Sequence, residues 1–357
     1  MHIVGARPNF MKVAPVMAAM QAREGFFDQV LVHTGQHYDY EMSQVFFEEL
    51  ALPEPDEFLN TGSGTHAEQT GRILLAFEPV LLKHRPDWVF VVGDVNSTLG
   101  CALVCSKMGV AVAHVEAGLR SWDRNMPEEI NRLLTDQIAD LLFTPSRDAD
   151  VNLLRVGIDP AKIHFVGNMM IDSLVRMLPA AKGRPILSRL GLCRGQYLLV
   201  TLHRPSNVDQ PEPLREILLA LDDLSRTRRV VFPVHPRTRG RIHQLDLRLK
   251  GIELMDPLGY LDFLALTEAA AVVVTDSGGI QEETTYLGVP CLTLRRNTER
   301  PVTVEIGTNR LVASERQDIL EAVDSALHAD RKATMRPELW DGQAAERIVE
   351  ILMKPAS

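Results

Sequence analysis

The sequence has few cysteines, and they are not arranged as a metal site or a disulfide framework. Among 357 residues there are only Cys101, Cys105, Cys193 and Cys291, with no CxxC pair. Most of them lie in apolar runs, which is typical of reduced thiols in the core of a cytoplasmic protein. We therefore expect neither disulfides nor a bound metal.

Long hydrophobic runs and an excess of positive charge are also missing. No apolar run reaches the roughly 18 to 20 residues of a membrane span, and a strand-like run begins at once, so we expect no anchor, no signal and a cytoplasmic location. The 38 basic and 47 acidic residues give a net charge of −9. This balance argues against a nucleic-acid binder but permits local cationic pockets for anionic small molecules.

Two familiar catalytic signatures are missing as well. No GxGxxG motif follows the first predicted strand, which disfavours a nicotinamide or flavin dinucleotide cofactor. There is no GxSxG elbow and no persuasive Cys/His pair for nucleophilic catalysis. A mononucleotide diphosphate is a better match to this sequence than a dinucleotide.

The periodicity that is present predicts an α/β protein with two doubly wound, Rossmann-like domains. The length is more than twice the roughly 150 residues of an ordinary domain, and short apolar runs alternate with helical segments. We place an N-terminal domain at 1–168, a second domain at 169–338 and a last helical segment at 339–357. From pattern alone, that last helix could pack against either domain.

The expected elements are short buried strands separated by amphipathic helices. We expect strands at 2–5, 30–34, 88–93, 110–116 and 141–144, then at 197–201, 230–234, 252–255, 271–275 and 289–294. One helix is expected directly after the first strand, and others are expected at 39–50, 65–85, 96–109, 127–139 and 342–353. In such sheets ligands bind beyond the carboxyl ends of the strands, so polar residues at those positions are the candidates for function.

Three carboxylates, Asp94, Glu116 and Glu128, follow strands or begin a helix in the first half. Carboxylates that gather around one substrate are suited to general acid and base catalysis. Simpler roles are also open: a turn for Asp94, a buried ion pair with a nearby arginine for Glu116, and a favourable first helical turn for Glu128. Of Glu128 and its neighbour Glu129, we expect one to be catalytic and the other structural.

In the second half, Ser277, Gly278 and Gly279 follow a predicted buried strand and open a helix. Backbone N–H groups at such a helix start can hold a phosphate, although a simple helix cap is the alternative. Glu283 lies further along the same helix, where it could accept hydrogen bonds from ribose hydroxyls. By spacing alone, an ordinary solvated glutamate is the more common explanation.

Cationic residues at the strand ends complete the pattern. Arg7 and Lys12 follow the first strand, and His203 and Arg300 lie in the second half. Each could neutralise a diphosphate, although any one alone is more often a surface charge. From the residues themselves we predict a two-domain enzyme that binds a nucleotide-like phosphorylated ligand between its halves, opposite a set of carboxylates.

In combination and order, the motifs resemble those of the non-hydrolysing UDP-N-acetylglucosamine 2-epimerases over nearly the whole chain. The matching stretches are 5–8 (GARP) with Lys12, 93–94 (GD), 114–120 (HVEAGLR), 127–132 (PEEINR), 203–204 (HR), 275–283 (TDSGGIQEE) and 298–301 (TERP). The resemblance implies a glycosyltransferase-B type fold, a central cleft, a last helix that crosses back to the first domain, and a homodimer.

The resemblance also implies a reaction that needs no cofactor. UDP-N-acetylglucosamine would lose its C2 proton and eliminate UDP to give 2-acetamidoglucal, and UDP would add back to give UDP-N-acetylmannosamine, a precursor of cell-envelope polysaccharide. Asp94, Glu116 and Glu128 would act at C2, and His203 would assist the departure of UDP. The substrate would be bound by Arg7, Lys12, Arg132, Ser277, Gly278, Gly279, Glu283 and Arg300.

Other functions stay open at this stage. Relatives of this fold hydrolyse the intermediate and release N-acetylmannosamine, some act on modified sugars such as a diacetamido uronic acid, and others are glycosyltransferases or could bind without catalysis. Residues 36–39 (QHYD) and 62–65 (GSGT) depart from the segments that form a substrate-activated allosteric site in bacterial relatives, and Asn9 replaces a common glutamate. These departures place allosteric activation and sugar specificity in question.

Overall fold

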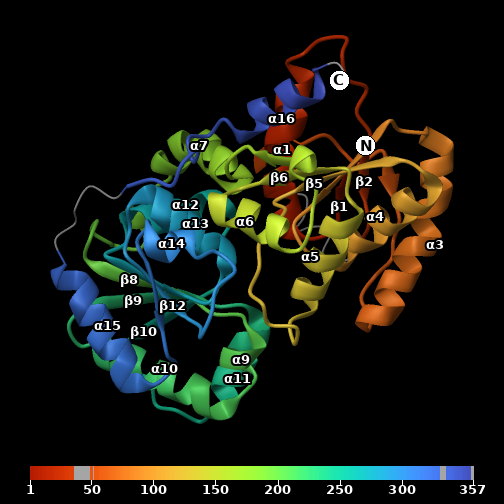
Figure 1. The fold of residues 1–357 in the computed structure, drawn as a ribbon. Coiled ribbons are helices and arrows are strands. Elements are labelled where there is room, and N and C mark those ends of the chain that lie inside the picture. Colours follow the sequence, from red (N-terminus) through yellow and green to blue (C-terminus); the bar gives the residue numbers. More distant parts are fainter. Residues whose placement is uncertain (36–48, 51, 330–334, 355–357) are drawn as a thin grey trace. The chain divides into compact units, whose positions relative to one another are not determined.

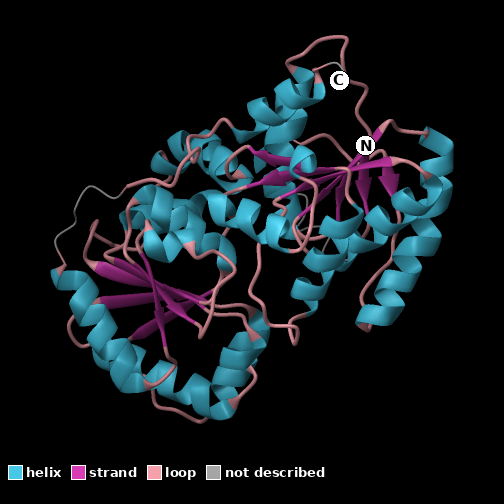
Figure 2. Ribbon diagram, in the orientation of Figure 1, coloured by secondary structure: helices cyan, strands magenta, loops and turns pink. Residues whose placement is uncertain are grey.

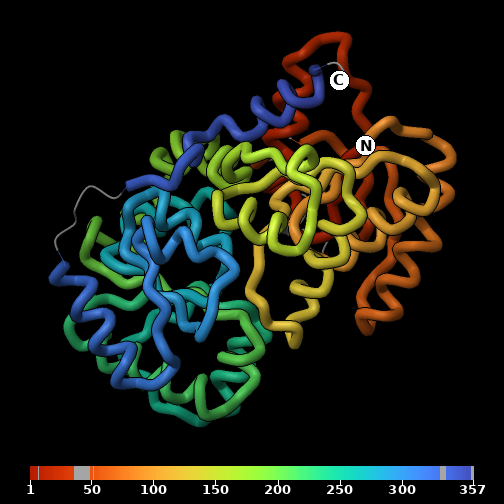
Figure 3. Tube along the Cα trace, in the orientation of Figure 1, coloured from red at the N-terminus to blue at the C-terminus, as the bar shows by residue number. Residues whose placement is uncertain are grey.

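A computed structural model describes residues 1–35, 49–50, 52–329 and 335–354, with only the main chain of Arg7. The segment 36–39 and most of the helix expected at 39–50 lie outside these residues. The chain divides into two compact units, Met1–Arg176 with Glu338–Ser357 and Met177–Pro337 (Figure 3). This division falls inside helix α7, Met169–Lys182, whereas the sequence analysis placed the domain boundary at its start.

The α/β class predicted from the sequence is confirmed, because each unit has a parallel sheet with helices packed around it (Figure 2). The first unit has seven strands in the order β3-β2-β1-β4-β5-β6-β7. Its elements are β1 (His2–Val4), α1 (Arg7–Gln21), β2 (Leu31–His33), β3 (Glu57–Phe58), α3 (His66–His84), β4 (Trp88–Val92), α4 (Asn96–Met108), β5 (Ala111–Val115), α5 (Pro127–Ile138), β6 (Leu141–Thr144), α6 (Arg147–Arg155), the 3₁₀ turn η1 (Pro160–Lys162), β7 (Ile163–Phe165), α7 and α16 (Ala344–Leu352).

The second unit has six parallel strands in the order β10-β9-β8-β11-β12-β13. Its elements are α8 (Ile186–Arg189), β8 (Tyr197–Thr201), α9 (Pro205–Val208), α10 (Pro211–Leu224), β9 (Arg229–Pro233), α11 (Pro236–Gln244), β10 (Ile252–Met255), α12 (Tyr260–Ala269), β11 (Val272–Thr275), α13 (Gly278–Leu287), β12 (Cys291–Leu294), α14 (Val302–Glu305), β13 (Asn309–Val312) and α15 (Arg316–His328). Figure 1 labels most of these elements.

Each predicted strand is present to within about two residues, but three short strands were not predicted. β3 has two residues, β7 carries His164 at its centre, and β13 begins with the polar pair Asn309 and Arg310. None of them is an apolar run. Their pairing with a neighbouring strand, which sequence periodicity does not report, makes them strands.

Local sequence signals explain where the helices begin and end. Thr65 and Glu68 form a capping box at the start of α3, and Arg85 ends that helix in a left-handed conformation. Asn9 fixes the start of α1: its Oδ1 accepts from the N–H groups of Gly5 and Ala6, each at 3.0 Å, and its Nδ2 donates to Val92 O at 3.1 Å. Asn9 is therefore occupied by backbone groups, which is a structural reason for its presence.

Each sheet reverses its strand order at one place, and the candidate residues follow the strands on both sides of it. In the first unit β1 lies between β2 and β4, and in the second β8 lies between β9 and β11. Crossover helices leave such a pair of strands in opposite directions, which opens a space at their carboxyl ends where ligands bind in open α/β sheets.

The C-terminal helix α16 belongs to the first unit and packs on α1 (Figure 1). Arg23 and Glu346 form an ion pair at 2.8 Å, and Trp340 donates to Pro145 O at 2.9 Å. The carboxylate of Asp172 in α7 accepts from the backbone N–H groups of Ala344 and Ala345, at 3.1 and 2.8 Å. Asp172 thus supplies the acceptor that the first turn of α16 lacks within its own sequence.

Helices that could cross a membrane are not found in the described part of the chain, since none is both long and apolar enough.

The cap at Asp172 predicts a measurable effect of pH on stability. Burial is the main cause that raises the pKa of Asp172 from its ordinary 3.8 to about 6, although the bonds from Ala345 and Ala344 oppose this. The folded state binds the proton of Asp172 more tightly than the unfolded state does, so protonation of Asp172 stabilises the fold. This stabilisation is complete at pH values below the pKa in the unfolded state and is lost as the pH rises through about 6. The loss is on the order of 2 to 3 kcal/mol.

Asp172→Asn keeps an acceptor oxygen but cannot ionise. Relative to wild type, its free energy of unfolding should therefore rise by on the order of 2 kcal/mol between about pH 4 and about pH 7. All three tryptophans lie in this unit, so urea unfolding followed by tryptophan fluorescence is the measurement. Asp159→Asn alters an exposed cap on η1 and is the control. An equal pH trend in both variants would contradict this role of Asp172.

Candidate functional site

Glu116 and Lys12 form a buried ion pair in the first unit. Their side chains are each 7% exposed, and Lys12 Nζ of α1 contacts Glu116 Oε2 beyond the end of β5. Glu116 has a φ of 69°, a left-handed conformation that a non-glycine residue keeps only when its surroundings enforce it. Among the contacts of the described side chains, Glu116 pairs with Lys12, whereas Arg120 pairs with Asp136.

Asp94 follows the neighbouring strand β4 and is bound by a second cation. Arg132 Nη2 of α5 lies 2.5 Å from Asp94 Oδ2, and Arg132 Nη1 lies 2.8 Å from Glu129 Oε2. Arg132 is thus held between two carboxylates. The side chain of Asp94 keeps 26% exposure, while Glu129 is fully buried. In the parallel pairing of β4 with β5, Val92 is the partner of Val115. Asp94 and Glu116 therefore follow the ends of two adjacent strands.

The structure separates the roles of Glu128 and Glu129. Glu129 accepts from Ser121 N at 2.9 Å and Trp122 N at 3.1 Å in addition to Arg132, so it fixes the loop before α5. Glu128 is exposed in the first turn of α5. Among the contacts of the described residues, none joins Glu128 to Asp94 or Glu116. The structure brings Asp94 and Glu116 to adjacent strand ends, and Glu128 lies one helical turn before Asn131 and Arg132, which both contact Asp94.

In the second unit, His203 and Asp276 form a hydrogen-bonded pair past the ends of the adjacent strands β8 and β11. His203 Nδ1 lies 2.9 Å from Asp276 Oδ1, and the imidazole is 57% exposed while Asp276 is fully buried. Burial raises the pKa of Asp276, but the hydrogen bond and charge of His203, with bonds from Arg204 and Asn207, lower it overall. An ionised Asp276 holds Nδ1–H of His203 and leaves Nε2 directed away from this carboxylate.

The start of α13 has the features expected of an anion site. Ser277 is its N-cap, and the side chain of Ser277 makes no capping hydrogen bond. Glu283 is 2% exposed and accepts from Tyr260 Oη at 3.0 Å. The alternative that Glu283 is an ordinary solvated glutamate is therefore wrong.

Arg300 lies directly against the first residue of α13. A Cβ atom on Gly278 would come within 2.5 Å of Arg300 Nη1 and 2.9 Å of Glu299 Oε1, so only glycine leaves room for these groups. Arg300 Nε is 2.8 Å from Glu282 Oε1, and Arg300 Nη1 is 2.5 Å from Glu299 Oε1. Arg300 is 7% exposed, as Lys12 is 6% exposed, so neither is a surface charge.

Glu299 is the centre of this group of charges. Its Oε2 lies 2.6 Å from Arg295 Nη2, and its Oε1 lies 3.8 Å from Arg204 Nη2 besides contacting Arg300. The single carboxylate of Glu299 thus faces three guanidinium groups, and Glu282 pairs with one of them, Arg300. Fixed positive charge and helical N–H groups are what a diphosphate requires.

Several of these residues were not assigned a role from the sequence. The sequence analysis assigned no separate role to Asp276, although its place after β11, beside His203 after β8, was a usable signal. Glu282 and Glu299 lie in the matched stretches 275–283 and 298–301 but were assigned no role, and Arg295 lies four residues before its partner Glu299. Two residues that the sequence analysis assigned to substrate binding lie at helix starts: Arg7 is the first residue of α1, and Gly279 is the second residue of α13.

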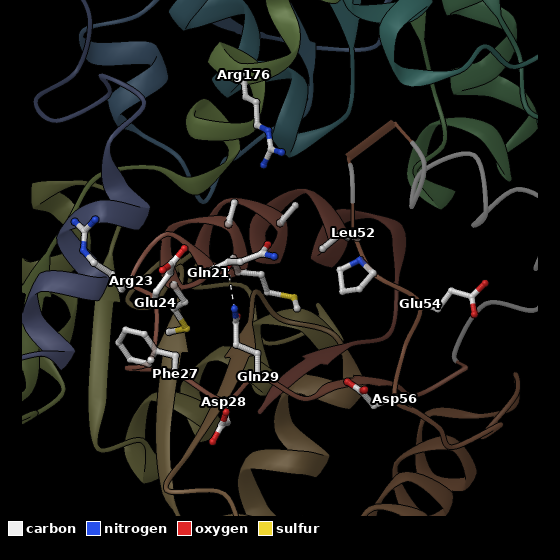
Figure 4. Close-up of a pocket in the computed structure, with 16 residues that line it drawn as sticks. Gln21, Arg23, Glu24, Phe27, Asp28, Gln29, Leu52, Glu54, Asp56 and Arg176 are labelled. Atoms are coloured by element: carbon white, nitrogen blue, oxygen red, sulfur yellow. Dashed lines mark hydrogen bonds between the residues drawn. The ribbon is translucent and has the colours of Figure 1, made fainter.

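A pocket of about 750 Å³ lies elsewhere on the first unit, beside α1. Figure 4 shows Arg176 of α7 pointing toward α1 across it. Its lining includes Met17, Gln21, Glu24, Phe27, Asp28, Gln29, Leu52, Glu54 and Asp56, and none of the predicted site residues. Within the described ranges, no group of three or more His, Cys, Asp or Glu residues could hold a metal ion.

Comparisons with known proteins agree with one another over nearly the full chain. A family model described as UDP-N-acetylglucosamine 2-epimerase matches residues 18–353. The UDP-N-acetylglucosamine 2-epimerase of Methanocaldococcus jannaschii is 45% identical, over 98% of this chain and 97% of that protein. The UDP-2,3-diacetamido-2,3-dideoxy-D-glucuronate 2-epimerase of Pseudomonas aeruginosa is 43% identical, over 99% and 98%.

Structure comparison gives the same result. A crystal structure of the Methanocaldococcus jannaschii UDP-GlcNAc 2-epimerase, in complex with UDP-GlcNAc and UDP, superimposes with a TM-score of 0.91 at 45% identity and covers 98% of both chains. The glycosyltransferase-B type fold expected from the sequence is thereby confirmed.

The three arginines around Glu299 predict that this residue is needed for folding. Glu299→Gln removes the charge between Arg295 and Arg300 and leaves buried guanidinium groups undercompensated, which should destabilise the second unit by about 3 kcal/mol. Chemical unfolding followed by circular dichroism measures this loss. Glu253→Gln is the matched control, since its pair with Arg229 at 2.5 Å is partly exposed and should contribute less than about 1 kcal/mol. Equal losses in both variants would contradict the assigned role of Glu299.

Proposed function

Because the chain belongs to the UDP-N-acetylglucosamine 2-epimerase family, a family of isomerases, we propose that it interconverts UDP-N-acetylglucosamine and UDP-N-acetylmannosamine without hydrolysis. The observation that carries this proposal is the pair of cation-bound carboxylates, Asp94 and Glu116, beyond adjacent strand ends of the first unit. The helix start at Ser277 and the charges around Arg300 support a role for the second unit in binding UDP.

The proposed reaction is an elimination followed by an addition. A carboxylate removes the proton from C2, the C1–O bond to UDP breaks, and a C1=C2 double bond forms to give 2-acetamidoglucal. A proton then returns to the opposite face of C2 while UDP oxygen bonds again to C1. Electrons and atoms balance without any redox step. Water must be excluded from C1 throughout, since its addition would release the free sugar.

Asp94 and Glu116 are our candidates for the proton transfers at C2, and Glu128 a third, exposed one. Two acids on opposite faces of the sugar would account for inversion at C2, because the proton is removed from one face and returned to the other. Lys12 and Arg132 hold Glu116 and Asp94 in place, which is the preorganisation that acid and base groups require.

His203 is our candidate for assisting the departure of UDP. With Nδ1–H held by Asp276, its Nε2 would donate a hydrogen bond to a phosphate oxygen or bridging oxygen when the imidazole is in its protonated form. Ser277, Gly278 and Gly279 would contribute helix N–H groups, and Arg7 and Arg300 positive charge. Glu283 would bind the ribose.

A second substrate is supported by one specific observation. The Pseudomonas aeruginosa relative at 43% identity is named for a diacetamido uronate sugar, so a UDP-linked diacetamido uronic acid is the alternative substrate for the same chemistry. The homodimer expected from the resemblance stays a prediction.

The function is tested by incubating the protein with UDP-N-acetylglucosamine in deuterated water and following C2 and the anomeric signals by proton NMR. We expect deuterium at C2 and the appearance of UDP-N-acetylmannosamine. Asp94→Asn and Glu116→Gln should each slow C2 exchange by about 100-fold or more, since each removes an acid or base group. Glu346→Gln changes an ion-paired carboxylate of the same unit and should exchange at the wild-type rate.

Other products would redirect the assignment. Free N-acetylmannosamine with UDP would identify a hydrolysing enzyme, and exchange only with the diacetamido uronate substrate would identify the second candidate. Full C2 exchange in both the Asp94 and the Glu116 variants would refute their roles.

UDP affinity tests the role of the second unit separately. Gly278→Ala places a methyl group against Arg300 and Glu299, both buried and ion-paired, so we expect at least a tenfold weaker affinity for UDP, about 1.4 kcal/mol. Isothermal titration calorimetry with UDP measures it. Gly240→Ala in α11, where an added Cβ atom meets nothing within 4 Å, is the control. Unchanged affinity in Gly278→Ala would place the phosphate elsewhere.

A further inference from the structure

A buried histidine and aspartate lie behind the two carboxylates of the first unit. His114 of β5 and Asp136 of α5 are both fully buried, with His114 Nδ1 at 2.7 Å from Asp136 Oδ1. Arg120 Nη1 lies 2.7 Å from Asp136 Oδ2. The proposed reaction uses none of these three residues, although His114 is two positions before Glu116.

The surroundings fix where the hydrogens of His114 are. Its Nε2 lies 2.8 Å from the carbonyl oxygen of Gly93, which can only accept, so Nε2 carries a hydrogen. Burial raises the pKa of Asp136, but His114 and Arg120 lower it overall. The Asp136 carboxylate is therefore ionised and can only accept, so Nδ1 of His114 carries a hydrogen too. His114 donates from both ring nitrogens.

These two donations connect the turns that carry the candidate acid and base groups. Gly93, whose carbonyl accepts from His114, directly precedes Asp94, and its N–H donates to Val115 O at 3.0 Å. Asp136 Oδ2 accepts from Gly118 N at 3.2 Å in the turn that follows Glu116. One side-chain pair thus holds the turn after β4 and the turn after β5 together.

The turn after β5 has a backbone conformation that needs such support. Gly93, Glu116 and Gly118 have φ values of 68°, 69° and 81°. Glu116 is not a glycine, so its left-handed conformation costs on the order of 1 kcal/mol and persists only if the surroundings determine it. The residue before Glu116, Val115, accepts from Gly93 N, and Gly118 two residues after Glu116 donates to Asp136, so the backbone is anchored on both sides of Glu116 along the chain.

We propose that His114 and Asp136 are positioning residues, which set the placement of Asp94 and Glu116 through the backbone of their turns. The catalytic part of this inference rests on the proposed function. The hydrogen bonds themselves do not, so the backbone can be examined independently of any activity.

The test uses three variants of the full chain and two measurements. His114→Leu removes both donors, Asp136→Asn removes the charge of the carboxylate that accepts from Nδ1, and His114→Gln keeps an amide that can donate to Gly93 O. Backbone amide hydrogen exchange is measured by mass spectrometry over residues 93–98 and 116–121. C2 deuterium incorporation from UDP-N-acetylglucosamine gives kcat and KM at a temperature where each variant is folded.

We expect His114→Leu and Asp136→Asn to speed amide exchange in both turns. Their kcat should fall by about 10- to 100-fold with KM changed by less than about threefold, because a displaced acid or base slows the chemical step more than binding. His114→Gln should recover part of kcat. His84→Gln, the same change at a histidine whose Nε2 lies 2.7 Å from Glu57 Oε1, is the control and should alter neither measurement.

The outcomes separate the two proposals. Unchanged amide exchange in both turns of Asp136→Asn and His114→Gln would overturn the positioning role, even if His114→Leu did not fold. Faster amide exchange with an unchanged kcat would overturn it as well. If the wild-type protein showed no C2 exchange with either sugar nucleotide while both turns loosened in the variants, the proposed function would fail and the support of the turns by His114 and Asp136 would stand.

Discussion

The structure of the candidate site depends on one constraint: a carboxylate removed from water requires a fixed positive charge beside it. The free-energy cost of burying an unpaired carboxylate exceeds what packing around it can return. Glu116 satisfies this constraint with Lys12, from a helix that begins more than a hundred residues earlier in the chain. The pairing fixes α1 to the end of β5 and so couples helix placement to the position of a candidate catalytic group.

In the second unit the same constraint holds for buried positive charges, which require carboxylates beside them. There the groups that need compensation are arginines, and Glu299 and Glu282 supply it. Arg204, Arg295 and Arg300 share the carboxylate of Glu299, and Glu282 binds Arg300 as well. The guanidinium groups are thus held close to the start of α13, where fixed positive charge would assist the binding of an anion such as a diphosphate. Gly278 is required in this arrangement because any side chain would displace Arg300.

The sequence predicts which strand ends carry function, since apolar runs and the polar residues that follow them are local features. The α/β class, the strands that carry Asp94, Glu116 and His203, and the helix start at Ser277 all follow from such features. The ion-pair partners of these residues do not follow from local features. Lys12 was assigned to a phosphate, and Glu116 was paired with an arginine as its structural alternative, because periodicity cannot report which distant side chain compensates a buried charge. Asp136 has no local signal for the same reason, because its partners are His114 and Arg120.

The two histidine–aspartate pairs contain the same residue types, but their surroundings suit them to different roles. In both, Nδ1 of the histidine meets an aspartate with a lowered pKa. His203 is 57% exposed, so its Nε2 has room for a ligand. His114 is fully buried, and its Nε2 is committed to Gly93 O. A histidine whose second nitrogen already binds the backbone cannot transfer a proton to a substrate without breaking that bond. It can hold a turn in place, and the turn that it holds leads directly to Asp94.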